Sequence, residues 1–258
     1  MFHQIQSRAL WCALFGLILP ASSAHAFRLS PMSASFTPTG KAGDLGSSLA
    51  FVLENDGTTK IAIQVTMVHR KPDLDGKEEL PSAEADFAVF PSQVILQARE
   101  KKTVRVSWIG KTLPTSELAY RIVAEQMDIS GLNSDGKKDP DKGAKIQVLL
   151  KFQGSVYVSP PRAEAKLAVE EPKPLAEGAT ELIIRNEGTK HQILNHPIIT
   201  FETLDRKGTF VLTEKDLAPL SGQNVLAGTR RKFVLTSPNL ARIPPAGNVS
   251  STRIEVSD

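Results

Sequence analysis

Apolar and polar residues alternate in short runs along most of the chain, and turn residues separate the runs. Residues 102–109 alternate Val104, Val106 and Trp108 with polar neighbours, and residues 119–126 repeat the pattern around Ile122. Alternation with a period of two indicates half-buried β-strands, and no convincing segment has helical periodicity. The pattern therefore predicts an all-β protein.

Turn sequences between the runs indicate how the strands connect. Residues 48–54 and 60–68 flank the sequence Asn-Asp-Gly-Thr at 55–58. Because Asp-Gly readily adopts the positive φ angles of a tight turn, these segments are predicted to form a hairpin. Asp-Gly at 75–76 predicts another turn.

The longest alternating run, residues 145–158, ends at Ser159-Pro160-Pro161. Prolines cannot donate to a strand ladder, so the chain is predicted to divide into domains of residues 27–159 and 160–258. The second domain repeats the earlier turn as Asn-Glu-Gly-Thr at 186–189, which suggests structural repeats. Strand signals recur about every 8 to 12 residues in each half, as in two immunoglobulin-like β-sandwiches.

Residues 1–26 have the pattern of a cleaved signal peptide. Arg8 precedes an apolar run at 9–19, and small residues end in Ala24-His25-Ala26. The run is too short for a membrane span, which needs about 20 residues. Its Cys12 is the only cysteine, so the remaining chain is predicted to be secreted without disulfides or zinc-thiolate sites.

Charge and chemical motifs exclude several function classes. Thirty-one Lys and Arg against 28 Asp and Glu give a net charge of +3, too small to predict nucleic acid or membrane partners. His69, His191 and His196 are interpreted as scattered surface residues, and the acidic and basic residues at 135–142 as a solvated loop. Without a catalytic or metal-binding motif, we predict no enzyme activity, no metal and no cofactor.

Several motifs in the first domain occur in a distinctive order. They are Phe90-Pro91, Leu96, Thr103-Val-Arg105-Val, Leu113-Pro114, Glu117-x-x-Tyr120-Arg121-Ile122 and the alternating run at 146–152. Together with the proline hinge and second domain, they make the chain resemble the PapD-like periplasmic chaperones of the chaperone/usher pathway. The resemblance covers nearly all of residues 27–258.

The resemblance implies two immunoglobulin-like domains in a boomerang arrangement and no ATP requirement. It implies that the chain binds pilus subunits by donor-strand complementation and delivers them to an outer-membrane usher. The lending strand would be residues 145–158, with Ile146, Val148, Leu150 and Phe152 in the subunit's groove. From the residues alone, this alternation also fits an ordinary half-buried strand. Exposure of these side chains in the free protein would favour self-association or capping by residues 128–144.

Family members anchor the subunit's terminal carboxylate with two basic residues, whose positions align with Ser33 and Ser155 here. The resemblance is closer to the archaic, or alternate, branch, in which Tyr-Arg and Lys-Phe sequences occur on the last two strands. It therefore implies Arg121 and Lys151 as the cationic anchor, with Arg28 in reserve.

The family also implies an interdomain ion pair and a long loop. Glu117 would supply the carboxylate of the pair, and Arg162 its partner, because Ser159 replaces the expected arginine. Residues 128–144 form the loop before the lending strand, and their low hydrophobicity predicts disorder until a subunit or usher binds.

Two other function classes remain open from the sequence. A structural pilin-like or adhesin sandwich of the cell surface would carry a disordered donor extension, whereas strand-like sequence starts here within a few residues of Phe27. A carbohydrate-binding or enzymatic protein would need an aromatic platform or a carboxylate pair. Aromatic residues make up only 6% of the chain, which disfavours that class.

Overall fold

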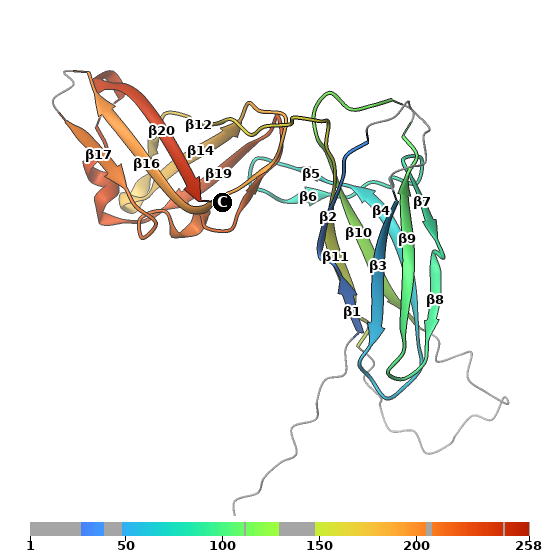
Figure 1. The fold of residues 1–258 in the computed structure, drawn as a ribbon. Coiled ribbons are helices and arrows are strands. Elements are labelled where there is room, and N and C mark those ends of the chain that lie inside the picture. Colours follow the sequence, from blue (N-terminus) through green and yellow to red (C-terminus); the bar gives the residue numbers. More distant parts are fainter. Residues whose placement is uncertain are drawn as a thin grey trace, which may run out of the picture.

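The computed structural model describes residues 27–38, 48–110, 112–128, 148–204, 208–244 and 246–257. These residues form two β-sandwiches set at an angle to each other (Figure 1). The helices among them are short 3-10 segments, and none is long and apolar enough to cross a membrane. The prediction of two β-sandwich domains in a boomerang arrangement is confirmed.

The first sandwich packs a four-stranded sheet against a five-stranded sheet. The four-stranded sheet has the order β1 (Phe27–Ser30), β3 (Ser48–Asn55), β9 (Lys101–Trp108), β7 (Phe87–Phe90). The five-stranded sheet has the order β2 (Ser33–Phe36), β11 (Lys151–Val158), β10 (Leu118–Met127), β4 (Ile61–His69), β8 (Gln93–Leu96). A separate hairpin of β5 (Lys71–Pro72) and β6 (Glu78–Glu79) projects from this domain toward the second one (Figure 1).

Alternating side chains from both sheets fill the interior of the first sandwich. Completely buried members of this core include Phe51, Leu53, Ile63, Leu96, Val104 and Ile122. Each large apolar side chain removed from water contributes about 1.5 to 3 kcal/mol to folding. The period-two pattern of β9 and β10 thus arises because one face of each strand packs on this core.

The first strand of the domain is split between the two sheets. β1 pairs with β3, whereas β2 runs parallel to β11 beside Ser155 to Val158 only. At the crossover, the Ser155 amide donates to the Met32 carbonyl at 2.8 Å. A Cβ on Gly154 would lie 3.2 Å from the Met32 carbonyl oxygen and 2.9 Å from Cγ2 of Ile122 on β10, so glycine lets the crossover lie close to β11.

The second sandwich contains the remaining strands and most of the short helices. One sheet places β14 (Thr180–Asn186) between β19 (Arg230–Leu235) and the edge segments β12 (Leu167–Val169) and β13 (Lys173–Pro174). Another has the order β17 (Thr209–Leu212), β16 (Asn195–Thr203), β20 (Val249–Ser257), and β15 (Gln192–Ile193) pairs with β18 (Asn224–Val225). The 3-10 segments are η2 (Ala176–Gly178), η3 (Ala218–Leu220), η4 (Pro238–Arg242) and η5 (Ala246–Asn248).

The predicted hairpin around residues 55–58 is wrong, because β3 and β4 lie in opposite sheets. Gly57 has no positive φ, and its amide donates to Oδ1 of Asn55 at 2.9 Å. The Asn55 side-chain amide donates to the carbonyls of Thr59 and Gln97, both at 2.8 Å. An asparagine side chain thus makes the turn and holds together a connection between sheets.

The second domain uses the same device at the repeated sequence. Oδ1 of Asn186 accepts from the Gly188 amide at 2.9 Å, and its Nδ2 donates to the carbonyls of Lys190 and Val225. Asn55 and Asn186 are each only 2% exposed. The sequence echo therefore corresponds to equivalent sheet-crossing turns in the two domains.

Removing either asparagine should destabilise the domain that contains it. We expect Asn55→Ala and Asn186→Ala each to lower the free energy of unfolding by about 2 kcal/mol, because buried carbonyls lose their donors. Urea unfolding followed by Trp108 fluorescence reports the first domain, and circular dichroism reports both. Asn248→Ala, at an exposed position, is the control. A larger effect of Asn186→Ala than of Asn55→Ala on the Trp108 transition would contradict this assignment.

Candidate functional site

A free sheet edge lies beside the crossover strand of the first domain. β2 covers only the second half of β11, so Lys151 to Gly154 has β10 on one side and no strand on the other within the described part of the chain. Leu150, just before β11, still lies beside β10, where the Gln126 amide donates to its carbonyl at 2.8 Å. An unpaired edge offers its amides and carbonyls to another strand.

The predicted donor residues take different positions at this edge. Ile146 lies outside the described residues, and Val148 is 69% exposed. Leu150 and Phe152 are half-buried against the core of the first domain, and the Phe152 ring meets Phe27 edge-on at a centroid distance of 4.8 Å. The exposed Val148 therefore lies three residues before the start of β11, next to the free edge.

The expected strand over 145–158 is too long, since β11 begins only at Lys151. Residues 148–150 have no strand assignment, and residues 145–147 lie outside the described residues. The ladder with β10 ends at the Glu125–Lys151 pair, and β2 is absent at this end. Alternation of side chains predicts which face of a segment is apolar, but a segment becomes a strand only where a neighbouring strand pairs with it.

Arg121 projects from β10 beside the crossover. Its Nη1 donates to Oγ of Ser155 at 2.7 Å, and Nε and Nη2 donate to the two carboxylate oxygens of Glu78 at 3.0 and 2.8 Å. Ser155 lies directly opposite Ser33 in the parallel β2–β11 pair. Arg121 therefore contacts one of the two positions that align with the family's basic pair, and the other position lies opposite it in the sheet.

Lys151 and Arg28 do not lie beside Arg121 in the free chain, so the expected anchor of Arg121 and Lys151 stays a prediction. Arg121 faces Ser155 across the ladder, whereas Lys151 faces Glu125 and pairs with it at 2.9 Å. Four strand positions separate Lys151 from Ser155, which corresponds to about 13 Å along β11. Arg28 is on the other sheet and pairs with Asp56 at 2.7 Å.

A second arginine contacts the same glutamate from the end of β4. Nε of Arg70 donates to Oε1 of Glu78 at 2.6 Å, and its Nη1 donates to the Tyr157 hydroxyl at 3.1 Å. Burial by itself would raise the pKa of Glu78, but the hydrogen bonds and charges of Arg121 and Arg70 outweigh it and hold the pKa below the ordinary value. Glu78 is therefore an ionised carboxylate between two guanidinium groups.

The β5–β6 hairpin links this cluster to the second domain. Its Leu74 carbonyl accepts from the Lys232 amide at 2.7 Å, and Asp75 pairs with the Lys232 ammonium at 2.8 Å. The predicted turn at Asp75-Gly76 is confirmed, with Gly76 at φ 83°. A Cβ on Gly76 would lie 2.5 Å from Nη2 of Arg231, so the absence of a side chain at Gly76 leaves room for that guanidinium against the hairpin.

A buried carboxylate joins the domains at the linker. Oε1 of Glu117 accepts from the His191 amide at 2.9 Å and lies 2.6 Å from its Nδ1, while Ser159 Oγ donates to Oε2 at 2.6 Å. Burial alone would raise the pKa of Glu117, but the hydrogen bonds from His191 and Ser159 leave it lowered. The His191 ring also stacks on Tyr157 at 3.8 Å.

Glu117 thus joins the two domains as expected, but its partner is His191 and not Arg162. The interpretation of His191 as a scattered surface residue is wrong. A single histidine carries no signal of an interface, because the surface that buries it comes from a different domain.

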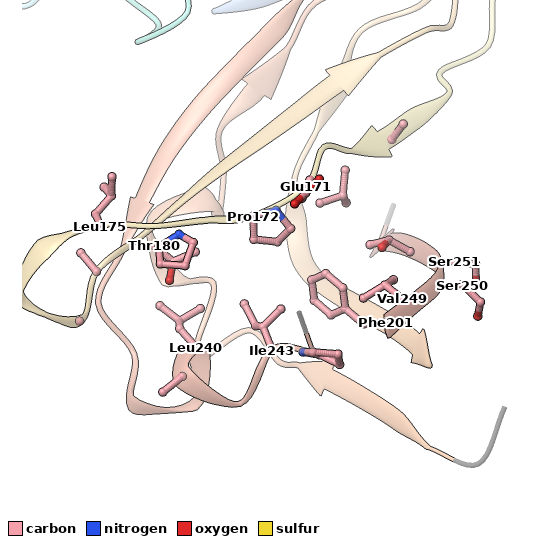
Figure 2. A pocket seen from close by; sticks show the side chains of 18 residues that line it. Glu171, Pro172, Leu175, Thr180, Phe201, Leu240, Ile243, Val249, Ser250 and Ser251 are labelled. Atoms are coloured by element: carbon pink, nitrogen blue, oxygen red, sulfur yellow. The ribbon is translucent and has the colours of Figure 1, made fainter. Parts of the chain in front are cut away.

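A cavity of 760 Å³ opens in the second domain, away from these residues (Figure 2). Phe201, Leu240, Ile243 and Val249 line it, and Glu171 is the only charged residue in its lining. It lies between η4, the start of β20 and the segment of β12 and β13, which Pro172 and Pro174 interrupt. The cavity brings no pair of acid and base groups together.

Sequence reasoning missed Glu78, Arg70 and Arg231. Glu78 and Arg121 are 43 positions apart, so spacing gives no indication of their contact. One available signal was the opposite charge of Arg70 and Glu78 on either side of the predicted Asp-Gly turn, since the two arms of a hairpin lie side by side.

Comparison with known proteins yields matches at the level of structure. No protein-family model and no curated protein matches the chain. A chain from a chaperone–tip adhesin complex of CFA/I fimbriae biogenesis is 15% identical, with 89% of this chain and 94% of that chain covered and a TM-score of 0.57. The class 5 fimbriae chaperone CfaA is also 15% identical, with 90% and 99% covered and a TM-score of 0.53.

A third match comes from the archaic branch. A chain of the CsuC–CsuE chaperone–tip adhesion subunit complex of Acinetobacter baumannii is 15% identical, with 82% of this chain and 88% of that chain covered and a TM-score of 0.55. At sequence identities this low, the structural similarity establishes the fold alone. The chain has the two-domain fold of the chaperone/usher fimbrial chaperones, as the sequence resemblance implied.

Proposed function

We propose that the protein is a periplasmic chaperone that binds pilus subunits by donor-strand complementation and delivers them to an outer-membrane usher. The observation that carries the proposal is the free edge of β11 at Lys151 to Gly154, next to the exposed Val148. A β-sandwich that lacks a strand exposes an edge and a groove of core residues. A borrowed strand satisfies both, because its backbone pairs with the edge and its alternate side chains enter the groove.

In this proposal the segment from Ile146 to Phe152 supplies the side chains. Val148 is already in solvent, and Leu150 and Phe152 lie at the margin of their own core. These positions share one face, so an extended backbone would present them together. Binding then buries apolar surface that the free protein exposes.

The fold and the amino-terminal segment support the cellular setting. The CsuC–CsuE structure is a chaperone with a tip subunit, which supports pilus subunits as partners of this chain. The signal-peptide pattern of residues 1–26, which lie outside the described residues, supports the periplasm. A binding role without catalysis follows from edge pairing, which needs no bond to be made or broken.

Co-expression with a pilus subunit whose gene adjoins this one tests the function. We expect a soluble complex of one chaperone and one subunit that forms without ATP. The subunit expressed alone should aggregate, because its groove stays exposed. A subunit that is soluble alone and does not co-purify with this chain would contradict the proposal.

We further propose that Arg121, supported by Ser155, anchors the terminal carboxylate of the subunit. Arg121→Ala should weaken the complex by about 10- to 100-fold, as expected for one charge-assisted hydrogen-bonded contact. Lys151→Ala removes an equal charge from an exposed ion pair and should change affinity by less than about fivefold. Competition between tagged and untagged chaperone for one subunit measures both. Equal losses would show that the carboxylate contacts Lys151 as well.

A further inference from the structure

Three arginines and one glutamate meet where the β5–β6 hairpin touches the second domain. Glu78 bonds Arg121 and Arg70, and their side chains are partly or largely buried. Arg231 approaches from β19 and lies against Gly76. The cluster therefore holds more guanidinium groups than carboxylates in surroundings that screen charge poorly.

Arg231 has unused hydrogen-bonding capacity. Its Nη1 donates to the Asn224 carbonyl at 3.2 Å, but its buried Nε has no acceptor. Glu78 and Asp73 are close enough to favour its charge, whereas burial and the charge of Arg70 oppose it and leave its pKa lowered. Asp73 is engaged in its own turn, where it accepts from the Lys77 amide at 2.8 Å. The Glu78 carboxylate is instead held by arginine side chains of the cluster itself, which can exchange with one another as its partners.

Arg121 differs from Arg231, because each of its three nitrogen atoms already donates a hydrogen bond. Glu78 accepts from Nε and Nη2, and Ser155 accepts from Nη1. An external carboxylate can occupy the Nε–Nη2 edge of Arg121 only if Glu78 withdraws from that edge.

We propose that Glu78 is an internal carboxylate that leaves Arg121 when an external carboxylate binds there, and that Arg70 and Arg231 then hold it. The identity of the ligand as a subunit's terminal carboxylate rests on the proposed function. In the exchange, Arg121 always faces one carboxylate, Glu78 keeps Arg70, and Arg231 gains an acceptor. Because Glu78 and Arg231 belong to different domains, binding at Arg121 adds an ion pair across the interface.

In this exchange Glu78 competes with the external carboxylate for Arg121, and Arg231 is a positioning residue that holds the displaced Glu78. Loss of the competitor should tighten carboxylate binding, and loss of Arg231 should weaken it by leaving displaced Glu78 with less compensation. The effect of Arg231 passes through Glu78. It should therefore disappear when Glu78 is neutral, which a double-mutant cycle detects.

The test uses the full chain and two probes, acetyl-Gly-Thr-Gly with a free carboxylate and the same peptide amidated. Chemical shifts of the arginine Nε–H groups give the affinities, and Arg121→Ala checks the site. We expect Glu78→Gln to bind the free acid about tenfold more tightly and Arg231→Ala about threefold more weakly than the parent chain. In the Glu78→Gln background, Arg231→Ala should have no effect. Arg230→Ala, at the neighbouring arginine paired with Glu170, is the matched control.

Each alternative result overturns the exchange. Weaker binding by Glu78→Gln would mean that Glu78 only positions Arg121. An undiminished loss from Arg231→Ala in that background would mean that Arg231 contacts the ligand directly. Equal binding of acid and amide by both the parent and Glu78→Gln would mean that no carboxylate binds. The peptide result is independent of the subunit co-expression, so either proposal can fail without the other.

Discussion

Replacing Val148 with Asp should abolish capture of a pilus subunit and leave both sandwiches folded. Val148 is 69% exposed and outside any strand, so the free chain tolerates a carboxylate there. In the proposed complex the same side chain enters an apolar groove, where burial of an unpaired charge costs several kcal/mol. We expect a loss of affinity of about 100-fold or more. Co-purification with the subunit measures the loss, and circular dichroism and thermal unfolding verify the fold.

Val211→Asp is the control for this experiment. Val211 is an exposed valine on β17 in the second domain, so the substitution adds the same charge away from the proposed donor segment. It should leave the complex intact. A Val148→Asp variant that still captures the subunit at normal yield would remove Val148 from the donor strand and count against the proposed binding mode.

Replacing Glu117 with Ala should lower the free energy of unfolding by about 3 kcal/mol and loosen the contact between the domains. The Glu117 side chain is only 1% exposed, and its carboxylate accepts hydrogen bonds from Ser159 and the His191 amide. Truncation leaves these buried donors without an acceptor, which explains the size of the effect. Urea unfolding measures the stability, and small-angle X-ray scattering measures the change in the average domain arrangement.

The contribution of Glu117 should also depend on pH. Its pKa is lower in the folded protein than the ordinary value of 4.5, so the unfolded chain takes up a proton first as the pH falls. The stabilisation is therefore complete at pH values above 4.5 and is lost as the pH falls through the folded-state pKa. The stability difference between the parent and Glu117→Gln should shrink over that range.

Glu125→Gln is the control, because Glu125 is exposed on β10, the strand that begins directly after Glu117. It should alter stability by less than about 1 kcal/mol. A stability difference for Glu117→Gln that stays constant on acidification would mean that the charge of Glu117 does not stabilise the interface.

Local patterns in the sequence predicted much of the fold. Alternation identified β9 and β10, and the prolines at 160 and 161 follow the last strand of the first sandwich. The Asp75-Gly76 turn was also correct, because Gly76 must adopt a φ that other residues avoid. These features depend on neighbouring residues and on which face of a strand is buried.

Pairings between distant strands were not predictable in the same way. Asn55 was placed in a hairpin, although its side chain connects strands of opposite sheets. Arg121 and Lys151 are correctly on adjacent strands, but the register puts them four positions apart in their ladder. A strand pattern with a period of two is compatible with many registers, and it does not say which other strands will pair with it.

By itself, the sequence determined the all-β class, the positions of the long strands β3, β4, β9 and β10, and the correspondence between the turns at Asn55 and Asn186. Tertiary structure alone decided that Glu78 lies between Arg70 and Arg121, that His191 is the partner of Glu117, and that half of β11 has an open edge. The physical reason is the range of the interactions. Backbone preferences and alternation act over a few residues, whereas ion pairs and sheet edges arise from segments that only folding brings together.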